Sequence, residues 1–411
     1  MDGNILFCRR IEIKYLCGKK STMKRLFYII IALVSGTVAM QAGETGQDHE
    51  SKKAKFVYDV NFEMNFDNRE FYESNFSSSM TIFGARLTPA VGLELATENN
   101  TSHRLMFGVD VMKDFGASPI SESIAGGQTA ETKTGLNNKE LFREISLYYR
   151  LNKKFNDTEM TLYAGIFPRR NMEGMYSQAF FSDSLKFYDN NLEGLLVKFK
   201  RPNAYYEVGC DWMGQYGENR RERFMIYSSG EGKVASFLTF GYSGYMYHFA
   251  NSEKVKALVD NILLNPYARL DFGKQTGFQT LSVTLGYLQA LQHNRVQVGH
   301  YVFPGGVHLD FEVRKWDVAV KNMAYYGYGI MPYYNYHDPG DIKFGNNLYL
   351  GDPFYRVYDI DSKERGLYDR FEVCYEPVVG KHLKIRVAAL LHFNNFRYSG
   401  FQQNVGIVLQ L

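Results

Sequence analysis

The chain has 411 residues, enough for two or three soluble domains or for one large closed β structure, so length excludes neither. Its 31 Tyr, 31 Phe and 37 Gly against only 10 Pro favour many pleated strands and disfavour a helix-rich fold. The net charge of +3 has a local origin, because residues 1–42 hold seven basic and two acidic side chains and the remainder holds 40 basic and 42 acidic ones. Beyond residue 42 no basic surplus supports binding to nucleic acid.

The basic leader has the organisation of a secretory signal peptide. A basic pair precedes the apolar run 26–34, and small residues follow, with plausible cleavage after Ala39 or Ala42. The run is shorter than the ~20 residues that a spanning helix needs, and no second such run follows. Met23 stands directly before the basic pair, so we expect translation to start there; alternatively, residues 1–22 form an unusually long n-region.

Downstream of the leader, apolar and polar residues alternate. From Phe56 to Asp67, rings and aliphatic chains such as Phe62 share one face, and Asp59 and Glu63 share the other. This period of two predicts an extended strand with one apolar and one wet side. Similar segments recur, and together with the first they predict about sixteen strands, with eighteen as the alternative. The predicted strands are 56–67, 80–97, 102–114, 141–151, 159–167, 191–200, 205–216, 221–229, 234–249, 263–273, 278–288, 300–314, 316–326, 367–377, 383–394 and 400–411.

The connections between these strands separate a membrane barrel from a soluble β-sandwich, which shows the same alternation. Long connections such as 115–140, 168–190 and 327–366 alternate with short ones such as 152–158 and 201–204. Long loops at one end and short turns at the other are typical of outer-membrane barrels. Aromatic residues also gather at strand ends, where amphipathic rings suit the two bilayer interfaces.

The last predicted strand is apolar on one face up to its final residue. Phe401, Val405, Ile407, Leu409 and Leu411 alternate with polar or small residues. A barrel accommodates such a strand because it pairs with the first one, whereas an open sheet would leave an unprotected edge. We therefore predict an all-β transmembrane antiparallel up-and-down barrel over 55–411, preceded by the leader 1–42 and a short periplasmic segment 43–54.

These features together resemble Gram-negative outer-membrane porins, and the likeness extends over the whole predicted mature chain. The resemblance implies a location in the bacterial outer membrane and a third long loop that folds back into the lumen and narrows it. The third long loop here is 168–190. The implied constriction residues are Arg169, Arg170, Glu173, Asp183, Lys186 and Asp189.

The strand register places charged side chains on the inner face. Arg or Lys facing lipid at the midplane would cost ~2–4 kcal/mol each, so the inner face must be wet. The candidate pore-lining residues are Arg150, Lys198, Lys200, Arg269, Asp310, Glu312, Arg314, Arg370, Glu372, Lys384 and Arg386. Sixteen strands enclose a lumen wider than their own side chains fill. The predicted function is therefore passive diffusion of small hydrophilic solutes or ions, without a cofactor, a metal or a nucleic-acid partner.

A dense aromatic cluster opens the longest loop. Its tyrosines, Tyr328, Tyr333, Tyr334 and Tyr336, either stack on a sugar ligand or anchor and pack the loop. In the loop 250–262, the spacing of apolar residues predicts a short amphipathic helix. Residues 343–357 lie in the longest predicted loop, and an additional hairpin there would give the alternative count of eighteen strands.

Two other functions are alternatives to a channel. In a lipid hydrolase on the outer wall, His248 is the candidate in the lipid-facing register, but no serine takes an obvious partnering position and no G-x-S-x-G motif is present. A ligand-binding or structural role is the other alternative. The sequence therefore predicts that the chain is not an enzyme. The expected partners are outer-membrane lipid, small hydrophilic solutes and, by resemblance to porins, further copies of the chain in a trimer.

Overall fold

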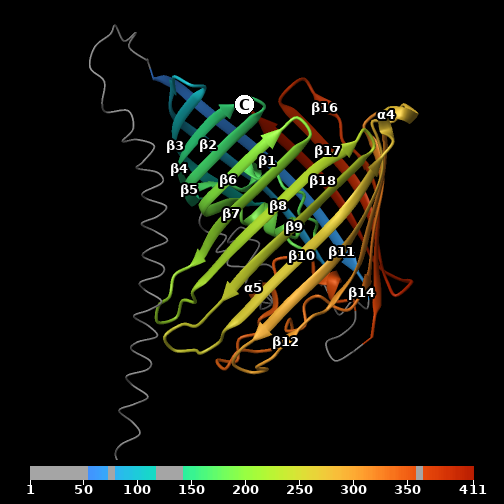
Figure 1. The fold of residues 1–411 in the computed structure, drawn as a ribbon. Coiled ribbons are helices and arrows are strands. Elements are labelled where there is room, and N and C mark those ends of the chain that lie inside the picture. The colour runs from blue at the N-terminus through green and yellow to red at the C-terminus, as the bar shows by residue number, and fades with distance from the viewer. Residues whose placement is uncertain (1–53, 73–78, 117–141, 358–363) are drawn as a thin grey trace, which may run out of the picture. The chain divides into compact units, whose positions relative to one another are not determined.

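The computed structural model describes residues 54–72, 79–116, 142–357 and 364–411. The strands of these ranges form one antiparallel sheet in which neighbours in the chain pair with one another. The first long strand, β1 (Lys55–Phe71), also pairs with the last, β18 (Arg397–Gln410), so the sheet closes into a barrel (Figure 1). The predicted leader and all but the last residue of the segment 43–54 lie outside the described residues.

Sixteen long strands build the barrel, as predicted, and two short strands extend it. The other long strands are β2 (Met80–Thr97), β3 (Thr101–Asp114), β4 (Phe142–Phe155), β5 (Thr158–Pro168), β6 (Asn191–Arg201), β7 (Ala204–Gly214), β8 (Arg223–Ala235), β9 (Leu238–Phe249), β10 (Val259–Asp271), β11 (Thr280–Asn294), β13 (Gly305–Lys315), β14 (Val318–Gly327), β15 (Gly366–Tyr375) and β17 (Leu383–Asn394). The short strands are β12 (Tyr301–Val302) and β16 (Val378–Val379). A four-residue helix, α4 (Gly273–Thr276), lies in the turn between β10 and β11.

The alternation of the sequence becomes the two faces of the wall. Outward side chains such as Leu93, Phe107 and Leu285 are more than half exposed, as lipid contact requires, whereas inward polar side chains such as Asp110 and Glu207 are buried. Long loops meet at one end of the barrel and short turns at the other. Because outer-membrane barrels keep their short turns in the periplasm, we refer to the extracellular end and the periplasmic end.

Two local predictions are wrong. Residues 250–258 contain no helix, and the apolar residues from Val259 onward begin β10, because pairing with β9 and β11 satisfies their backbone groups. The stretch 343–357 contains no hairpin and holds two short helices instead. Among the described residues no helix is long and apolar enough to span a membrane.

Candidate functional site

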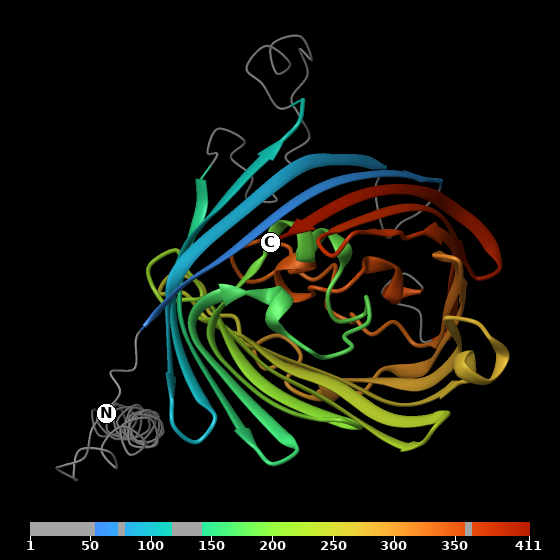
Figure 2. The same cartoon turned by 90° about the horizontal axis from the view of Figure 1, so that it is seen from above.

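Two long loops fold into the barrel instead of standing above it. Figure 2 shows them inside the ring of strands, one in green between β5 and β6 and one in orange between β14 and β15. The first inward loop contains η1 (Arg169–Asn171) and α3 (Asp183–Tyr188). The second contains α5 (Gly345–Leu348) and η2 (Pro353–Arg356). The predicted location of 168–190 inside the lumen agrees with this arrangement, and the second inward loop was not predicted.

The two inward loops are bonded to each other through their backbones. The amide of Ser182 donates to the carbonyl of Leu350 (2.9 Å), and the amide of Asp352 donates to the carbonyl of Gln178 (2.7 Å). Gly351 lies between these bonds, where a Cβ would meet the carbonyl oxygen of Ala179 at 2.0 Å, so only glycine allows this approach. The loops therefore form one unit within the lumen.

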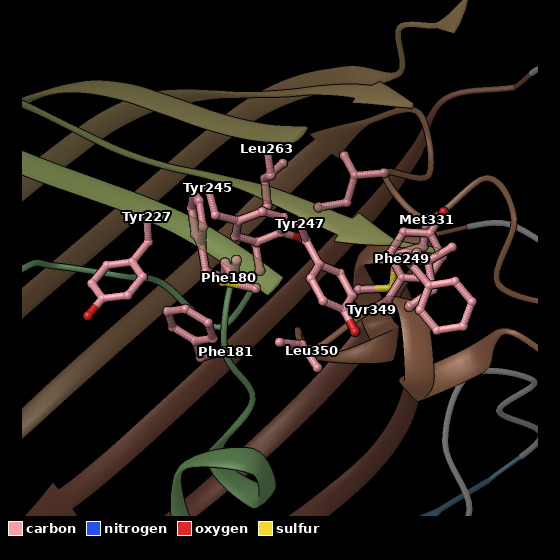
Figure 3. Packing of buried hydrophobic residues seen from close by; sticks show 14 of the residues in the cluster. Phe180, Phe181, Tyr227, Tyr245, Tyr247, Phe249, Leu263, Met331, Tyr349 and Leu350 are labelled. Carbon is pink, nitrogen blue, oxygen red and sulfur yellow. The ribbon is translucent and has the colours of Figure 1, made fainter. Parts of the chain in front are cut away.

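Aromatic packing attaches this unit to the wall. Phe180 of the first loop lies edge-on to Tyr245 of β9, with ring centres 5.5 Å apart, and Phe344 of the second loop lies edge-on to Phe249 (5.7 Å). Figure 3 shows rings of the wall and the loops in one cluster. Each of these four rings is at most 5% exposed. Such contacts combine apolar burial with favourable edge-to-face geometry, so the loops are fixed parts of the structure.

Ion pairs between the first inward loop and the wall use most of the predicted constriction residues. Arg169 contacts Asp189 (3.0 Å) and Asp211 of β7 (3.5 Å), and Arg170 contacts Asp59 of β1 (2.9 Å). Glu207 of β7 accepts hydrogen bonds from the backbone amides of Glu173 (2.7 Å) and Gly174 (2.9 Å). These residues therefore hold the loop in position.

The side chain of Glu173 pairs with two lysines of β6. Its carboxylate lies 3.6 Å from the amine of Lys198 and also contacts Lys200. Burial opposes ionisation of this carboxyl, but the hydrogen bond from Lys200 and the charge of Lys198 outweigh it and lower the pKa of Glu173. Two predicted pore-lining lysines thus bind the inward loop.

Asp183 is the first residue of α3, and its carboxylate joins the first inward loop to β15. It lies 3.6 Å from the guanidinium of Arg370 on β15 and 4.0 Å from the amine of Lys186, and it accepts a hydrogen bond from Gln178 (2.6 Å). Partial desolvation within the lumen opposes ionisation of this half-exposed carboxyl, but the charges of Arg370 and Lys186 outweigh it and hold the pKa of Asp183 below its ordinary value. At neutral pH this carboxylate therefore ties α3 to the wall.

Two hollows border α3. One, of about 460 Å³, opens toward the extracellular end and is lined by Asp183, Leu185, Asp352 and Phe354 among others. The second, of about 510 Å³, lies toward the periplasmic end, and Lys186 and Arg370 are among its lining residues. Asp183 lines the first hollow and Arg370 the second, so their ion pair lies between the two spaces.

A network of charges lies at the periplasmic end. Glu376, in the turn after β15, contacts Arg314 and Arg386 and lies 3.6 Å from Lys321. Glu372 contacts Arg386 (2.7 Å) and Lys321 (3.5 Å) as well. Burial would raise the pKa of Glu376, but the hydrogen bond from Arg314 and the charges of Lys321 and Arg386 lower it to about 2. Glu376 is therefore ionised at neutral pH, and it lies beside Lys321, which lines the second hollow.

Most of the other predicted pore-lining residues have a protein partner at close range. The partners are Tyr163 for Arg150 (5.8 Å to the ring centre), the Asn171 carbonyl for Lys198 (2.7 Å), Glu231 for Arg269, His308 for Asp310 (3.4 Å) and Arg314 for Glu312 (3.0 Å). Lys384 is exposed near the periplasmic end. Within the described ranges, no group of three or more His, Cys, Asp or Glu side chains is arranged to hold a metal ion.

The four candidate stacking tyrosines differ in accessibility. Tyr333 is 2% exposed, and the guanidinium of Arg356 lies 4.0 Å from the ring centre of Tyr334. Tyr328 and Tyr336 are 37% and 38% exposed. Loop packing therefore uses the first two rings, and only the other two present a large surface to solvent.

An outward-facing cluster lies at the extracellular end of the wall. The rings of Trp212, Phe224 and His248, on the adjacent strands β7, β8 and β9, stack with centres 5.5 and 4.9 Å apart. His248 Nδ1 lies 3.2 Å from the carboxylate of Asp260 on β10, which accepts a hydrogen bond from Arg295 (2.7 Å). The other ring nitrogen, Nε2, makes no hydrogen bond to any described residue. A carboxylate on Nδ1 orients a histidine so that Nε2 can act as a base.

Sequence reasoning placed His248 on the lipid-facing side but found no partner for it. Asp260 is its partner because the register of β9 against β10 sets the two residues directly opposite each other. The sequence did contain one indication of this pairing: His248 and Asp260 both lie at lipid-facing positions of their strands, on either side of the same extracellular loop.

The sequence of this chain matches the model of a known protein family. Residues 48–410 match the model of the lipid A 3'-O-deacylase-type family. The chain belongs to this family. No curated protein matches the chain. Membership in the lipid A 3'-O-deacylase-type family contradicts the prediction that the chain is not an enzyme, because the family is an enzyme family.

The fold of this lipid A 3'-O-deacylase-type chain is similar to solved outer-membrane proteins. A loop L8 deletion mutant of OmpT from Vibrio cholerae has a TM-score of 0.50 at 9% identity, over 87% of this chain and 99% of that one. OccK9 of Pseudomonas aeruginosa has a TM-score of 0.48 at 10% identity, over 87% and 98% of the two chains. The predicted outer-membrane porin-type barrel is confirmed as a fold.

Proposed function

We propose that the barrel passes small hydrophilic solutes or ions along its lumen, through a narrow point at α3. The observation that carries this proposal is the pair of hollows separated by the contact between Asp183 and Arg370. Both inward loops narrow the lumen but leave space on each side of α3. A solute that moves past this contact crosses from the extracellular hollow to the periplasmic one.

The size and charge of the two hollows support small and hydrophilic solutes. Each has a volume of about 500 Å³, at the lower end of the range for ligand pockets. Their linings include charged side chains of both signs, such as Arg269, Glu312 and Lys321, which replace part of the hydration of a polar solute. The proposed channel is therefore narrow and polar.

Single-channel recording tests this function. The protein, extracted from outer membranes in detergent, is reconstituted into a planar lipid bilayer under a salt gradient. Discrete, stable current steps are expected, and the sign of the reversal potential reports whether anions or cations pass more readily. A folded, heat-modifiable barrel that gives no current steps would contradict the channel.

A second candidate function is the hydrolysis of an acyl ester at the outer wall. Family membership and the pairing of His248 with Asp260 favour it. In this reaction, Nε2 of His248 takes a proton from water while the hydroxide adds to the ester carbonyl. The bond from the carbonyl carbon to the alcohol oxygen then breaks, and the proton passes to that oxygen, giving an alcohol and a carboxylic acid. His248 lies one residue from the extracellular end of β9, at the level of the outer leaflet.

Mass spectrometry tests the second candidate. The purified protein is incubated with lipid A in detergent micelles, and released fatty acid and deacylated lipid are measured. Release that depends on active protein supports hydrolysis, and unchanged lipid A after extended incubation contradicts it. The two functions use opposite faces of the wall, so neither result decides the other.

A further inference from the structure

A carboxylate lies on the lipid-facing side of β15. The side chains of its neighbours Tyr368 and Arg370 are buried inside the barrel, and successive side chains of a strand point to opposite faces, so Asp369 points outward. Phe371, two residues further on, has the same orientation and is 36% exposed. Asp369 is therefore an ionisable residue on a surface that faces lipid.

The partner of Asp369 is a side chain of the adjacent strand. Asn322 of β14 also points outward, because its neighbour Lys321 contacts Glu372 inside the barrel. The amide nitrogen of Asn322 donates a hydrogen bond to Oδ1 of Asp369 (2.7 Å) and lies 3.5 Å from the carbonyl oxygen of Arg370. Among the described residues, Oδ2 of Asp369 has no hydrogen-bond donor.

This polar pair lies near the middle of the wall. β14 and β15 have ten residues each, and Asn322 is the fifth residue of β14 and Asp369 the fourth of β15. Ten residues of a tilted strand span roughly 25 Å, the height of the apolar band of an outer-membrane barrel. The pair is therefore well inside the band, where lipid offers no hydrogen bond to a polar side chain.

Apolar side chains surround the polar pair. Asn322 is directly opposite Phe311 of β13 on one side and Phe371 of β15 on the other, and Asp369 is directly opposite Ala324 of β14. The side chain of Ala324 is a single methyl group, so it leaves the carboxylate accessible from the lipid side. Polar groups with small residues beside them are typical of contacts between membrane-spanning segments.

The polar pair is complementary to itself. Oδ2 of Asp369 needs a donor, and the second amide hydrogen of Asn322 has only the long contact to the carbonyl of Arg370, which a shorter bond can replace. Two copies related by a two-fold axis would place the donor of each beside the acceptor of the other, which gives two equal hydrogen bonds. A protonated Asp369 also fits this arrangement, because its hydroxyl would donate to the amide oxygen of the partner's Asn322.

We propose that the outward face of β13, β14 and β15 is the contact surface between two copies of this chain, joined by reciprocal hydrogen bonds between Asn322 and Asp369. The resulting assembly is a dimer, whereas the resemblance to porins implies a trimer. The proposal is independent of passage through the lumen and of ester hydrolysis, because this surface faces lipid and lies on other strands than His248 and Asp260.

Sedimentation equilibrium of the detergent-extracted protein, in solvent that matches the density of the detergent, tests the proposal. We expect the wild type to sediment as two chains in equilibrium with one. Asp369→Leu removes the acceptor and turns an apolar side chain toward lipid, and it is expected to raise the dissociation constant of the dimer about tenfold, as loss of two hydrogen bonds within a membrane would give. Ser228→Ala, which removes an outward hydroxyl from β8, is the matched control and is expected to leave the constant unchanged.

A second variant tests the contact surface without removing the hydrogen-bonding groups. Ala324→Trp fills the space beside Asp369 and is expected to weaken the dimer at least as much as Asp369→Leu. Heat-modifiable migration in gels shows that each variant retains the folded barrel. A wild type that sediments as one chain or as three, or a dimer that either variant leaves unchanged, would overturn the proposal.

Discussion

The guanidinium of Arg370 on β15 lies 3.6 Å from the carboxylate of Asp183 on α3, which joins an inward loop to the wall between two hollows. Arg370 also contacts Glu372 at 3.2 Å, so one cation holds both a wall carboxylate and a loop carboxylate. The width of the lumen at this level therefore depends on charge as well as on packing.

Replacing Asp183 with Asn is expected to loosen α3. The half-exposed carboxylate makes this ion pair worth about 1 kcal/mol, and its loss raises the population of the displaced helix about fivefold. Single-channel records should then show larger and noisier steps. Asp157→Asn, in the exposed turn between β4 and β5, is the matched control. Identical records for the wild type and both variants would show that α3 does not limit the current.

Replacing Phe354 with Ala is expected to release the second inward loop. Phe354 is 1% exposed and stacks on Tyr368 with ring centres 4.9 Å apart, so truncation costs about 3–5 kcal/mol of local packing. Local opening exposes the loop to protease, and cleavage within 328–357 should accelerate. Phe396→Ala, at an 87% exposed position, is expected to change nothing. Equal cleavage rates for the two variants would contradict this role for Phe354.

Replacing Glu376 with Gln is expected to lower stability in a pH-dependent way. The pKa of this carboxyl falls from an ordinary 4.5 to about 2 in the folded protein. A depressed pKa contributes stability above the unfolded value and loses it as pH falls toward the folded value. The free energy of unfolding should therefore differ between wild type and variant by about 1–3 kcal/mol at pH 7, and this difference should shrink between pH 4.5 and 2. A difference independent of pH in urea titrations would refute the ionic origin.

Replacing His248 with Ala is expected to abolish ester hydrolysis while leaving conductance unchanged. Loss of a general base reduces the rate of proton transfer by about 10²–10⁴-fold. Fatty-acid release from lipid A measures the first effect and bilayer recording the second. His382→Ala, in the exposed turn at the periplasmic end, provides the control, because its ring contacts only the carbonyl of Gln410 among the described residues. Equal release by the wild type and His248→Ala would exclude His248 as the base.

The strands of this barrel are local properties of the sequence. Two predicted strands, 80–97 and 383–394, coincide with β2 and β17, because alternation of lipid-facing and inward residues is imposed at every step by the bilayer and the wet interior. The prediction of a helix in 250–262 is wrong because its apolar residues from Val259 onward belong to a strand. A spacing of three and four is weak over so short a stretch, and strand pairing on both sides satisfied the backbone instead.

The family, in contrast, could not be derived from the alternation, because any outer-membrane barrel must alternate whatever its activity. The sequence alone therefore predicted a channel and no enzyme, and the second part of that prediction is wrong. His248 carried a usable signal, but its partner Asp260 became visible only when the strand register was known.

The sequence by itself determined the closed wall, the number of long strands and the two ends of the barrel, since these follow from residue periodicity and loop length. The tertiary structure alone decided that 328–357 folds inward beside 168–190, that Arg370 meets Asp183 and that His248 meets Asp260. Each of these contacts joins residues from different elements. Their distances are set by the register and closure of the whole sheet, which no local pattern encodes.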